Sequence, residues 1–170
     1  MSFNKNKQFF RMPEISDLVK YAINYLSKYS SSKSNLERIL RNKIRKTNIE
    51  KKEKFTLYSS ISEIIKKLEK NNFINDYNYA TSKVNIFISS GKSKIFIKNY
   101  LFKKGIDEKL SSEIFAELNE EDSNWEIKSA RIFARKKNFQ KNNSNYEKNL
   151  SKMARAGFSY EIAKKILEET

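Results

Sequence analysis

Apolar residues recur at helical spacing along most of the chain. Stripes with gaps of three and four residues run through Ile61–Leu68 and Ile162–Leu167, and such stripes are typical of amphipathic helices. Alternation of the β type is scarce. The 170 residues include one proline and three glycines, so little interrupts a helix. The pattern predicts an all-α protein of about nine helices, near residues 14–29, 34–46, 55–71, 76–90, 93–104, 107–119, 122–138, 145–156 and 159–169.

The predicted helices form three sets of three that align with one another. The first helix of each set carries a residue pair ending in alanine, and the second carries an apolar pair. These pairs are Tyr21-Ala22, Tyr79-Ala80 and Ser129-Ala130, then Leu36/Leu40, Ile97/Leu101 and Leu150/Met153. Such recurrence indicates a duplicated unit. We expect three tandem three-helix repeats, near 14–72, 76–120 and 122–170, stacked into an elongated, curved array after a flexible basic tail over 1–13.

Two glycines support the duplication. Each follows a basic helix end and precedes an apolar residue, in Lys103-Lys104-Gly105-Ile106 and Arg155-Ala156-Gly157-Phe158. Their separation is 157 − 105 = 52 residues. A left-handed glycine commonly ends a helix in this way, so we predict a positive φ at both.

Other local signals are less specific. Thr47–Lys54 is interpreted as a linker, and Trp125 as a packing residue rather than an exposed anchor. The aromatic residues at helical spacing are interpreted as core residues rather than as base-stacking platforms. Short acceptor side chains are expected to cap helix starts at Asp76, Ser93, Asp107, Asp122 and Ser159.

The charge adds a functional clue. Lys and Arg number 35 against 20 Asp and Glu, a net charge of +15, and only seven of the 35 are Arg. An excess of this size indicates a polyanionic partner, while A+T-rich coding sequence is a second explanation for the lysines. The candidate binding cations are Arg38, Arg41, Arg45, Lys92, Lys94, Lys98, Lys103, Lys104, Arg131, Arg135, Lys136 and Lys137.

Several classes of chemistry are disfavoured. The chain has no cysteine and no histidine, so disulfides, thiol catalysis and the commonest general base are missing. Neither a Gly-rich phosphate loop nor an acidic metal cluster is apparent. No apolar run approaches the length of a membrane span. We expect a cytoplasmic, monomeric protein that is not an enzyme and needs no cofactor or metal.

Three segments resemble the RecX family in order and spacing. Asn72–Ala80, followed by Gly91-Lys92-Ser93 and Leu101–Ile106, resembles the family's central repeat, and Tyr21–Leu36 its first repeat. Met153–Tyr160 resembles its closing basic-Gly-Phe-Ser signature. The resemblance covers about residue 14 to the C-terminus. It implies tandem three-helix repeats and a non-enzymatic modulator of the RecA recombinase. Such a modulator would lie in the groove of the RecA–single-stranded-DNA filament and suppress extension, ATPase, strand exchange and SOS co-protease activity.

Two other functions stay open at this point. One is a nonspecific DNA-binding protein that acts through lysine–phosphate contacts, and direct DNA contact would also suit the first interpretation. The other is a helical scaffold for another protein, with a charge that reflects codon usage.

Overall fold

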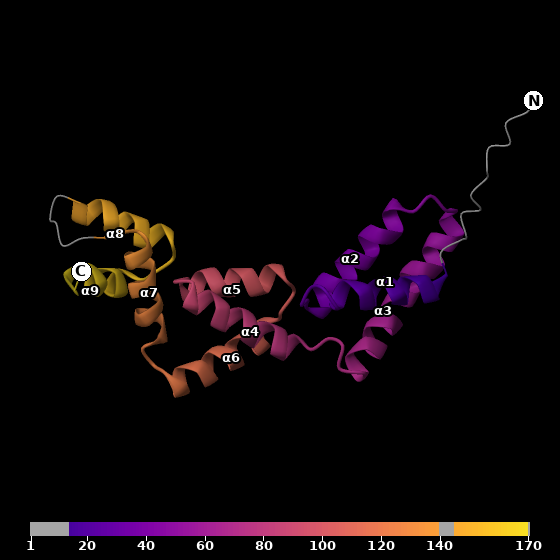
Figure 1. Ribbon diagram of the computed structural model, residues 1–170, viewed down its shortest axis with the longest axis horizontal. Coiled ribbons are helices and arrows are strands. Elements are labelled where there is room, and N and C mark those ends of the chain that lie inside the picture. The colour runs from indigo at the N-terminus through magenta and orange to yellow at the C-terminus, as the bar shows by residue number, and fades with distance from the viewer. Residues whose placement is uncertain (1–13, 140–144, 170) are drawn as a thin grey trace, which may run out of the picture. The chain divides into compact units, whose positions relative to one another are not determined.

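The computed structural model describes residues 14–139 and 145–169, and within these residues the fold is entirely helical. The tail predicted over 1–13 lies outside the described residues. The helices in chain order (Figure 1) are α1 (Ile15–Leu26), α2 (Lys33–Lys46), α3 (Lys51–Lys70), α4 (Asp76–Ser89), α5 (Lys94–Lys103), α6 (Glu108–Glu121), α7 (Trp125–Lys136), α8 (Tyr146–Arg155) and α9 (Tyr160–Glu169).

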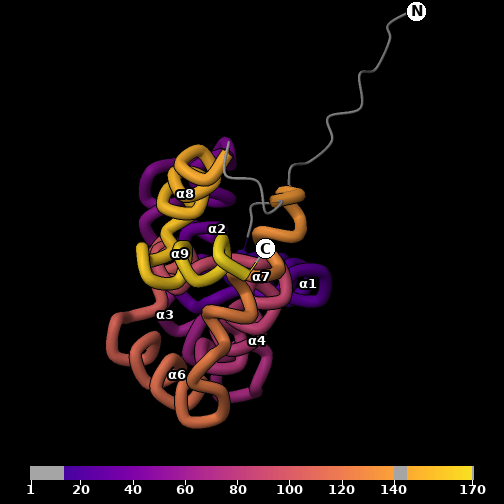
Figure 2. The backbone as a smooth tube through the Cα atoms, turned by 90° about the vertical axis from the view of Figure 1, so that its left-hand side faces the viewer, coloured from indigo at the N-terminus to yellow at the C-terminus, as the bar shows by residue number. Residues whose placement is uncertain are grey.

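Three hydrophobic cores follow the three sets of helices. The first core draws on α1–α3, the second on α4–α6, and the third on α7–α9. The aligned alanines Ala22, Ala80 and Ala130 are all fully buried, one in each core. In the third set, α8 and α9 lie side by side with α7 against α9 (Figure 2). The all-α prediction and the grouping of the helices by threes are therefore confirmed.

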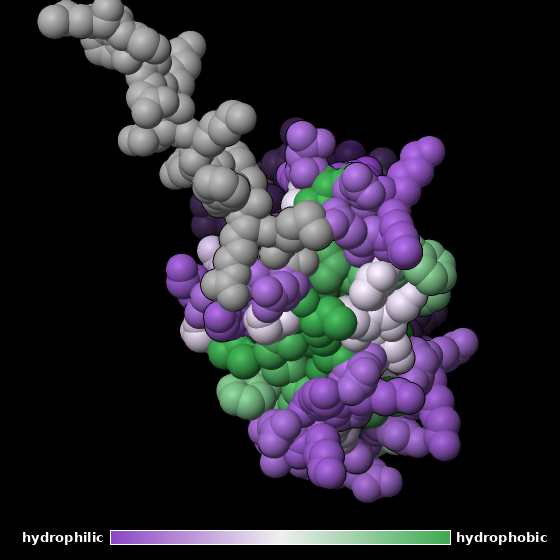
Figure 3. Space-filling view, turned by 90° about the vertical axis from the view of Figure 1, so that its right-hand side faces the viewer, coloured by the Kyte–Doolittle hydropathy of each residue, from purple (hydrophilic) through white to green (hydrophobic). Residues whose placement is uncertain are grey.

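The chain divides into two compact units. Among the described residues, one unit comprises residues 14–31 together with Asn35–Ile74, and the other comprises Ser32–Ser34 together with residues 75–139 and 145–169. Hydrophobic residues gather in a band between hydrophilic surfaces on the first unit (Figure 3). Exposed hydrophobic side chains of this unit include Ile15, Ile23 and Phe55. The repeat limits near residues 72 and 120 stay a prediction.

All three glycines end helices in the left-handed conformation. Gly105 has φ 72° and Gly157 has φ 89°, which confirms the prediction. At Gly105 the amide donates to Phe102 O at 2.8 Å and the next amide donates to Leu101 O at 3.1 Å. This pair of hydrogen bonds closes the helix end and turns Ile106, 2% exposed, into the second core.

The same contact occurs at both of these glycine turns. The Ser32 hydroxyl donates to the carbonyl oxygen of Lys104, the residue before Gly105. The Ser93 hydroxyl donates to the carbonyl oxygen of Ala156, the residue before Gly157, at 2.6 Å. Both serines are fully buried. We call these two contacts the serine–turn contacts.

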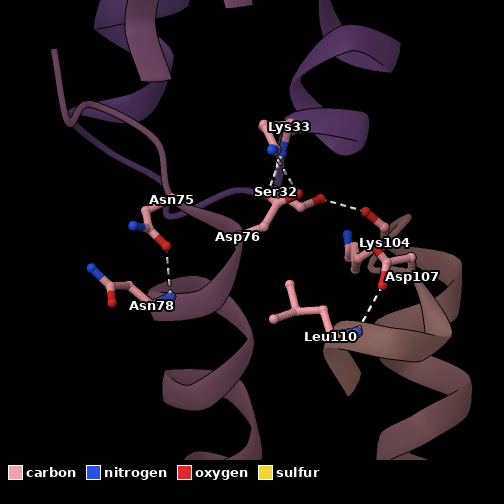
Figure 4. Close-up of polar contacts among 8 residues, drawn as sticks. All are labelled: Ser32, Lys33, Asn75, Asp76, Asn78, Lys104, Asp107 and Leu110. Atoms are coloured by element: carbon pink, nitrogen blue, oxygen red, sulfur yellow. Dashed lines mark hydrogen bonds and ion pairs between the residues drawn. The ribbon is translucent and has the colours of Figure 1, made fainter. Parts of the chain in front are cut away.

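A carboxylate accompanies each serine–turn contact. The Lys33 amide donates to Asp76 Oδ1 at 2.8 Å, and the Lys94 amide donates to Glu126 Oε1 at 2.8 Å. Figure 4 shows the first arrangement, with Ser32 and Lys33 placed against Lys104 and Asp76. In each case, two consecutive residues near the start of one helix contact two later parts of the chain. The serine hydroxyl binds the end of a later helix, and the lysine amide binds a carboxylate near the start of another later helix. Two matching polar contacts support a duplicated unit independently of the sequence pattern.

Several local expectations were wrong. The linker is only Thr47–Glu50, because α3 begins at Lys51 and the Glu50 amide donates to Glu53 Oε2 at 3.1 Å. Asn75 caps α4 by accepting from the Asn78 amide, since the Asp76 carboxylate is engaged by Lys33. Asp122 ends α6 instead of capping α7. The caps at Ser93, Asp107 and Ser159 are confirmed.

Trp125 is a packing residue, as expected. It is 3% exposed and belongs to the second core, although it begins α7. Its ring stacks on Phe115 with centroids 5.7 Å apart, and its Nε1 donates to Asn119 Oδ1 at 2.8 Å. This hydrogen bond satisfies the buried indole.

Gly105→Ala should destabilise the protein by about 2 kcal/mol or more. A left-handed L-residue costs about 1 kcal/mol, and the added Cβ would collide with Oγ and Cβ of Ser34. Urea unfolding checks this value. The double variant Gly105→Ala/Ser34→Gly removes the collision. It should therefore recover the stability lost to the collision, but not the stability lost to the left-handed backbone at residue 105. A Gly105→Ala variant as stable as the wild type would contradict the left-handed turn.

Ser93→Ala should cost about 1–3 kcal/mol, because the variant leaves the half-buried Ala156 carbonyl without its donor and removes the cap of α5. Ser89→Ala is the matched control, since Ser89 is exposed and its hydroxyl donates only to Asn85 O within α4. Thermal melts should show a clear loss for Ser93→Ala and almost none for Ser89→Ala. Equal melting temperatures would show that the serine–turn contact contributes nothing to stability.

Candidate basic interaction surface

All of α5 and all of α4 after its first residue, Asp76, carry positive charge without any acidic residue. Between Tyr77 and Ile106 there are six lysines, and the first carboxylate after this stretch is Asp107. Helices of this protein elsewhere mix both signs, as in the Arg41–Glu37 pair of α2. We call residues 77–106 the α4–α5 hairpin. Such one-signed charge favours an anionic partner.

Aromatic rings connect the two helices of the hairpin. Phe87 of α4 meets Phe96 and Tyr100 of α5 edge to face, with centroids 5.4 and 4.6 Å apart. The hydroxyls of Tyr100 and Tyr79 lie 3.2 Å apart. These rings therefore fix the spacing of α4 and α5.

Lysine ammonium groups lie over these rings. Lys92 Nζ is 4.7 Å from the centroid of Phe96, and Lys104 Nζ is 5.7 Å from that of Tyr100. On α4, Lys83 Nζ is 5.7 Å from the centroid of Tyr79. A cation over an aromatic face is attracted to it without losing its charge. The rings thus orient the ammonium groups, which keep their charge.

Buried hydroxyls hold both ends of α5. At its start, the Ser129 hydroxyl of α7 lies 2.8 Å from Lys92 O and 3.2 Å from Ile88 O. At its end, the Ser32 hydroxyl binds Lys104 O (Figure 4). The backbone that carries Lys92 and Lys104 is therefore fixed at both ends.

The remaining cations of α5 differ in their surroundings. Lys94 Nζ lies 5.5 Å from the centroid of the buried Phe115. Lys98 and Lys103 have no carboxylate within ion-pair distance among the residues that the structure describes. Lys98 and Lys103 are thus available to an anion.

The basic end of α7 adjoins the turn between α4 and α5. Lys136 Nζ donates to Ser90 O at 3.2 Å, and a Cβ on Gly91 would lie 2.7 Å from Phe133 N. Arg135 and Lys137 are exposed on the same helix end. The structure thus brings the candidates at the end of α7 next to the turn that holds Lys92, which precedes Lys136 by 136 − 92 = 44 residues in the sequence.

Arg131 is already paired. Its Nε and Nη2 donate to the two carboxylate oxygens of Glu169 at 2.9 and 3.1 Å. This bond raises the pKa of Arg131 and lowers the pKa of the Glu169 carboxyl. Because its charge is compensated, Arg131 is a weaker candidate for phosphate contact than Arg135 or Lys137.

The three candidates of α2 lie in the first unit. Arg41 pairs with Glu37 at 2.8 Å and lies over Tyr58 at 5.8 Å from the centroid. Arg38 donates to Asn35 Oδ1 at 2.7 Å. Arg45 is exposed at the helix end. The twelve candidates therefore form one group in the first unit and one group in the second.

Lys83 and the aromatic contacts of the hairpin were missed by sequence reasoning. The acid-free run from Tyr77 to Ile106 is a signal that could have found them, since it starts within α4 and not at α5. In the described part of the chain, no three His, Cys, Asp or Glu side chains gather as metal ligands. None of the helices described has the length and hydrophobicity needed to cross a bilayer.

Comparison with known proteins agrees with this architecture. No protein-family profile matches the chain. The regulatory protein RecX of Myxococcus xanthus (strain DK1622) is 32% identical over 155 residues, which are 86% of this chain and 82% of that protein. The crystal structure of RecX from Lactobacillus salivarius matches with a TM-score of 0.67 at 29% identity, over 91% of this chain and 95% of that chain.

A further crystal structure, of a regulatory protein RecX, has a TM-score of 0.62 at 21% identity over 91% of this chain and 73% of that chain. This match supports the helical fold alone. The identity to the Myxococcus protein extends over most of both sequences. The resemblance of the repeat motifs is thereby confirmed, and the chain belongs to the RecX family of regulatory proteins.

Proposed function

We propose that this protein is a negative regulator of the RecA recombinase that binds the RecA–single-stranded-DNA filament. Bound in the filament groove, it would block extension and reduce ATP hydrolysis, strand exchange and SOS co-protease activity. Membership of the RecX family supports this assignment, since the Myxococcus relative is named regulatory protein RecX. The observation that carries the proposal is the acid-free α4–α5 hairpin with the basic end of α7 beside it.

The arrangement suits binding better than catalysis. A nucleoprotein filament presents DNA phosphates and acidic protein side chains, and both accept from lysine and arginine. Lys98, Lys103, Arg135 and Lys137 have no carboxylate partner among the described residues, so they can contact a filament without first breaking an ion pair. Arg131 would have to leave Glu169 to do so.

Regulation of RecA should appear below one molecule of this protein per RecA protomer. A ligand of the filament gains contacts from RecA itself, whereas a nonspecific DNA coat must cover the DNA first. The measurement is ATP hydrolysis by RecA on single-stranded DNA, titrated at two salt concentrations, beside anisotropy on bare DNA. If inhibition begins only when bare DNA would be saturated, the protein is a nonspecific DNA binder and the proposal is wrong.

The triple variant Arg135→Ala/Lys136→Ala/Lys137→Ala should inhibit RecA roughly tenfold less well. Three exposed contacts at about 0.5 kcal/mol each sum to about 1.5 kcal/mol, which is close to a factor of ten. Adding Arg131→Ala should change inhibition little, because Arg131 is paired with Glu169.

The control Lys66→Ala/Lys70→Ala/Lys148→Ala removes the same charge from exposed positions of α3 and α8 outside the candidate set. It should inhibit like the wild type. Equal losses in the two triple variants would mean that total charge, and not the end of α7, determines binding. Melting temperatures within error of the wild type confirm that both variants fold.

A further inference from the structure

A groove beside α5 has no role in the surface described so far. It has a volume of 560 Å³ and lies between the C-terminal half of α5 and the start of α6. Lys98, Asn99 and Phe102 line one side, and Ile106, Glu108 and Ser111 are among the residues of the other side. All of these residues belong to the second unit.

Phe102 is the most exposed of the large hydrophobic side chains described, at 79%. It lies on the face of α5 that carries Lys98 and Asn99, four and three residues earlier. Phe87, Phe96 and Tyr100 of the hairpin each contact another ring. Phe102 has no ring contact among the described residues, so its face is free to stack on a ligand.

Ser111 is an unpaired hydrogen-bonding group in the opposite wall. The residue is 6% exposed, and its hydroxyl has no hydrogen-bond partner within the described structure. A buried hydroxyl is normally paired, so this one indicates a missing partner. The Asn99 side chain, which is exposed, adds an amide donor and acceptor to the groove.

The α5 side of the groove favours a strand of nucleic acid over a peptide. Lys98 lines the groove and Lys103 follows Phe102, both within the acid-free hairpin, while the α6 side carries two carboxylates. Of the two carboxylates on the α6 side, Asp107 already accepts from the Leu110 amide at 2.7 Å as a helix cap, and Glu108 is exposed. Binding of single strands combines cations for the phosphates with an aromatic ring for the bases, and this groove offers both.

We propose that the groove holds one base of a single-stranded nucleic acid, stacked on Phe102. Ser111 and Asn99 bind the base edge, and Lys98 and Lys103 contact the adjoining phosphates. The site deepens the proposed function and rests on it, because it gives the protein a direct contact with the DNA of the filament. Its test uses bare DNA, so its failure is distinct from a failure to regulate RecA.

The test compares two fluorescent probes, a short oligo(dT) and an abasic strand of the same length. Phe102→Ala should weaken oligo(dT) binding at least about fivefold, the reduction expected for one stacked base. It should leave abasic binding unchanged, because the abasic strand keeps the phosphates and lacks the bases. Phe102→Trp should bind oligo(dT) at least as tightly as the wild type.

Salt dependence separates the two parts of the site. Phe102→Ala should leave the slope of log affinity against log salt unchanged, since stacking releases no counterions. Lys98→Ala/Lys103→Ala should reduce the magnitude of this slope by roughly 0.7 for each phosphate that the variant no longer neutralises.

The matched aromatic control is Phe55→Ala on α3, where the ring is 73% exposed. It should bind both probes like the wild type.

Three results would overturn the proposal. They are wild-type binding of oligo(dT) by Phe102→Ala, equally weakened binding of the two probes, and an equal effect of Phe55→Ala. If Phe102→Ala impairs RecA inhibition but not oligo(dT) binding, the groove receives a protein segment and the nucleic-acid assignment is wrong. Because Phe102 is exposed, none of these variants should alter the melting temperature.

Discussion

The serine–turn contact is the interaction on which the rest of the second unit depends. A left-handed glycine ends a helix and leaves the preceding carbonyl pointing out of it, and a buried serine hydroxyl from an earlier helix start meets that carbonyl. The contact is made once by Ser32 with Lys104 and once by Ser93 with Ala156. Because the donor is buried in both places, neither turn can relax into water without leaving a polar group unpaired. Glycine is required for its backbone angle and for the space taken by Ser34 at Gly105 and by Ser93 at Gly157.

The same contact places the basic surface. Its first copy fixes the end of α5 that carries Lys103 and Lys104, and the Ser129 hydroxyl fixes the other end at Lys92. A binding surface made of lysines is usually diffuse, since lysine has a long and flexible side chain. Here the backbone is held at both ends and the ammonium groups lie over aromatic rings. The surface is therefore more ordered than its composition alone would indicate, which reduces the entropic cost when a partner binds.

Local signals predicted most of the fold, and long-range pairings account for what they missed. The helical stripes and the alanine pairs located the helices and their cores, because both depend on residues within a few turns of one another. Asp76 was expected to cap its own helix, yet Lys33, 43 residues away in sequence, takes its carboxylate. Arg131 looked like an open cation, yet Glu169 pairs with it from 38 residues away.

Each serine–turn contact joins a donor serine in one set of three helices to an acceptor turn in the next set along the chain. Eight residues before the buried Leu40, Leu101 and Met153 stand Ser32, Ser93 and Asn145, and four residues after them stand Ile44, Gly105 and Gly157. The α1–α3 set has a donor but no acceptor turn, because Ile44 lies inside α2. The α7–α9 set has an acceptor turn, but Asn145 replaces the serine donor. Among the described residues, the α4–α6 set alone has both, so it carries the donor and the acceptor turn that a further tandem copy would need.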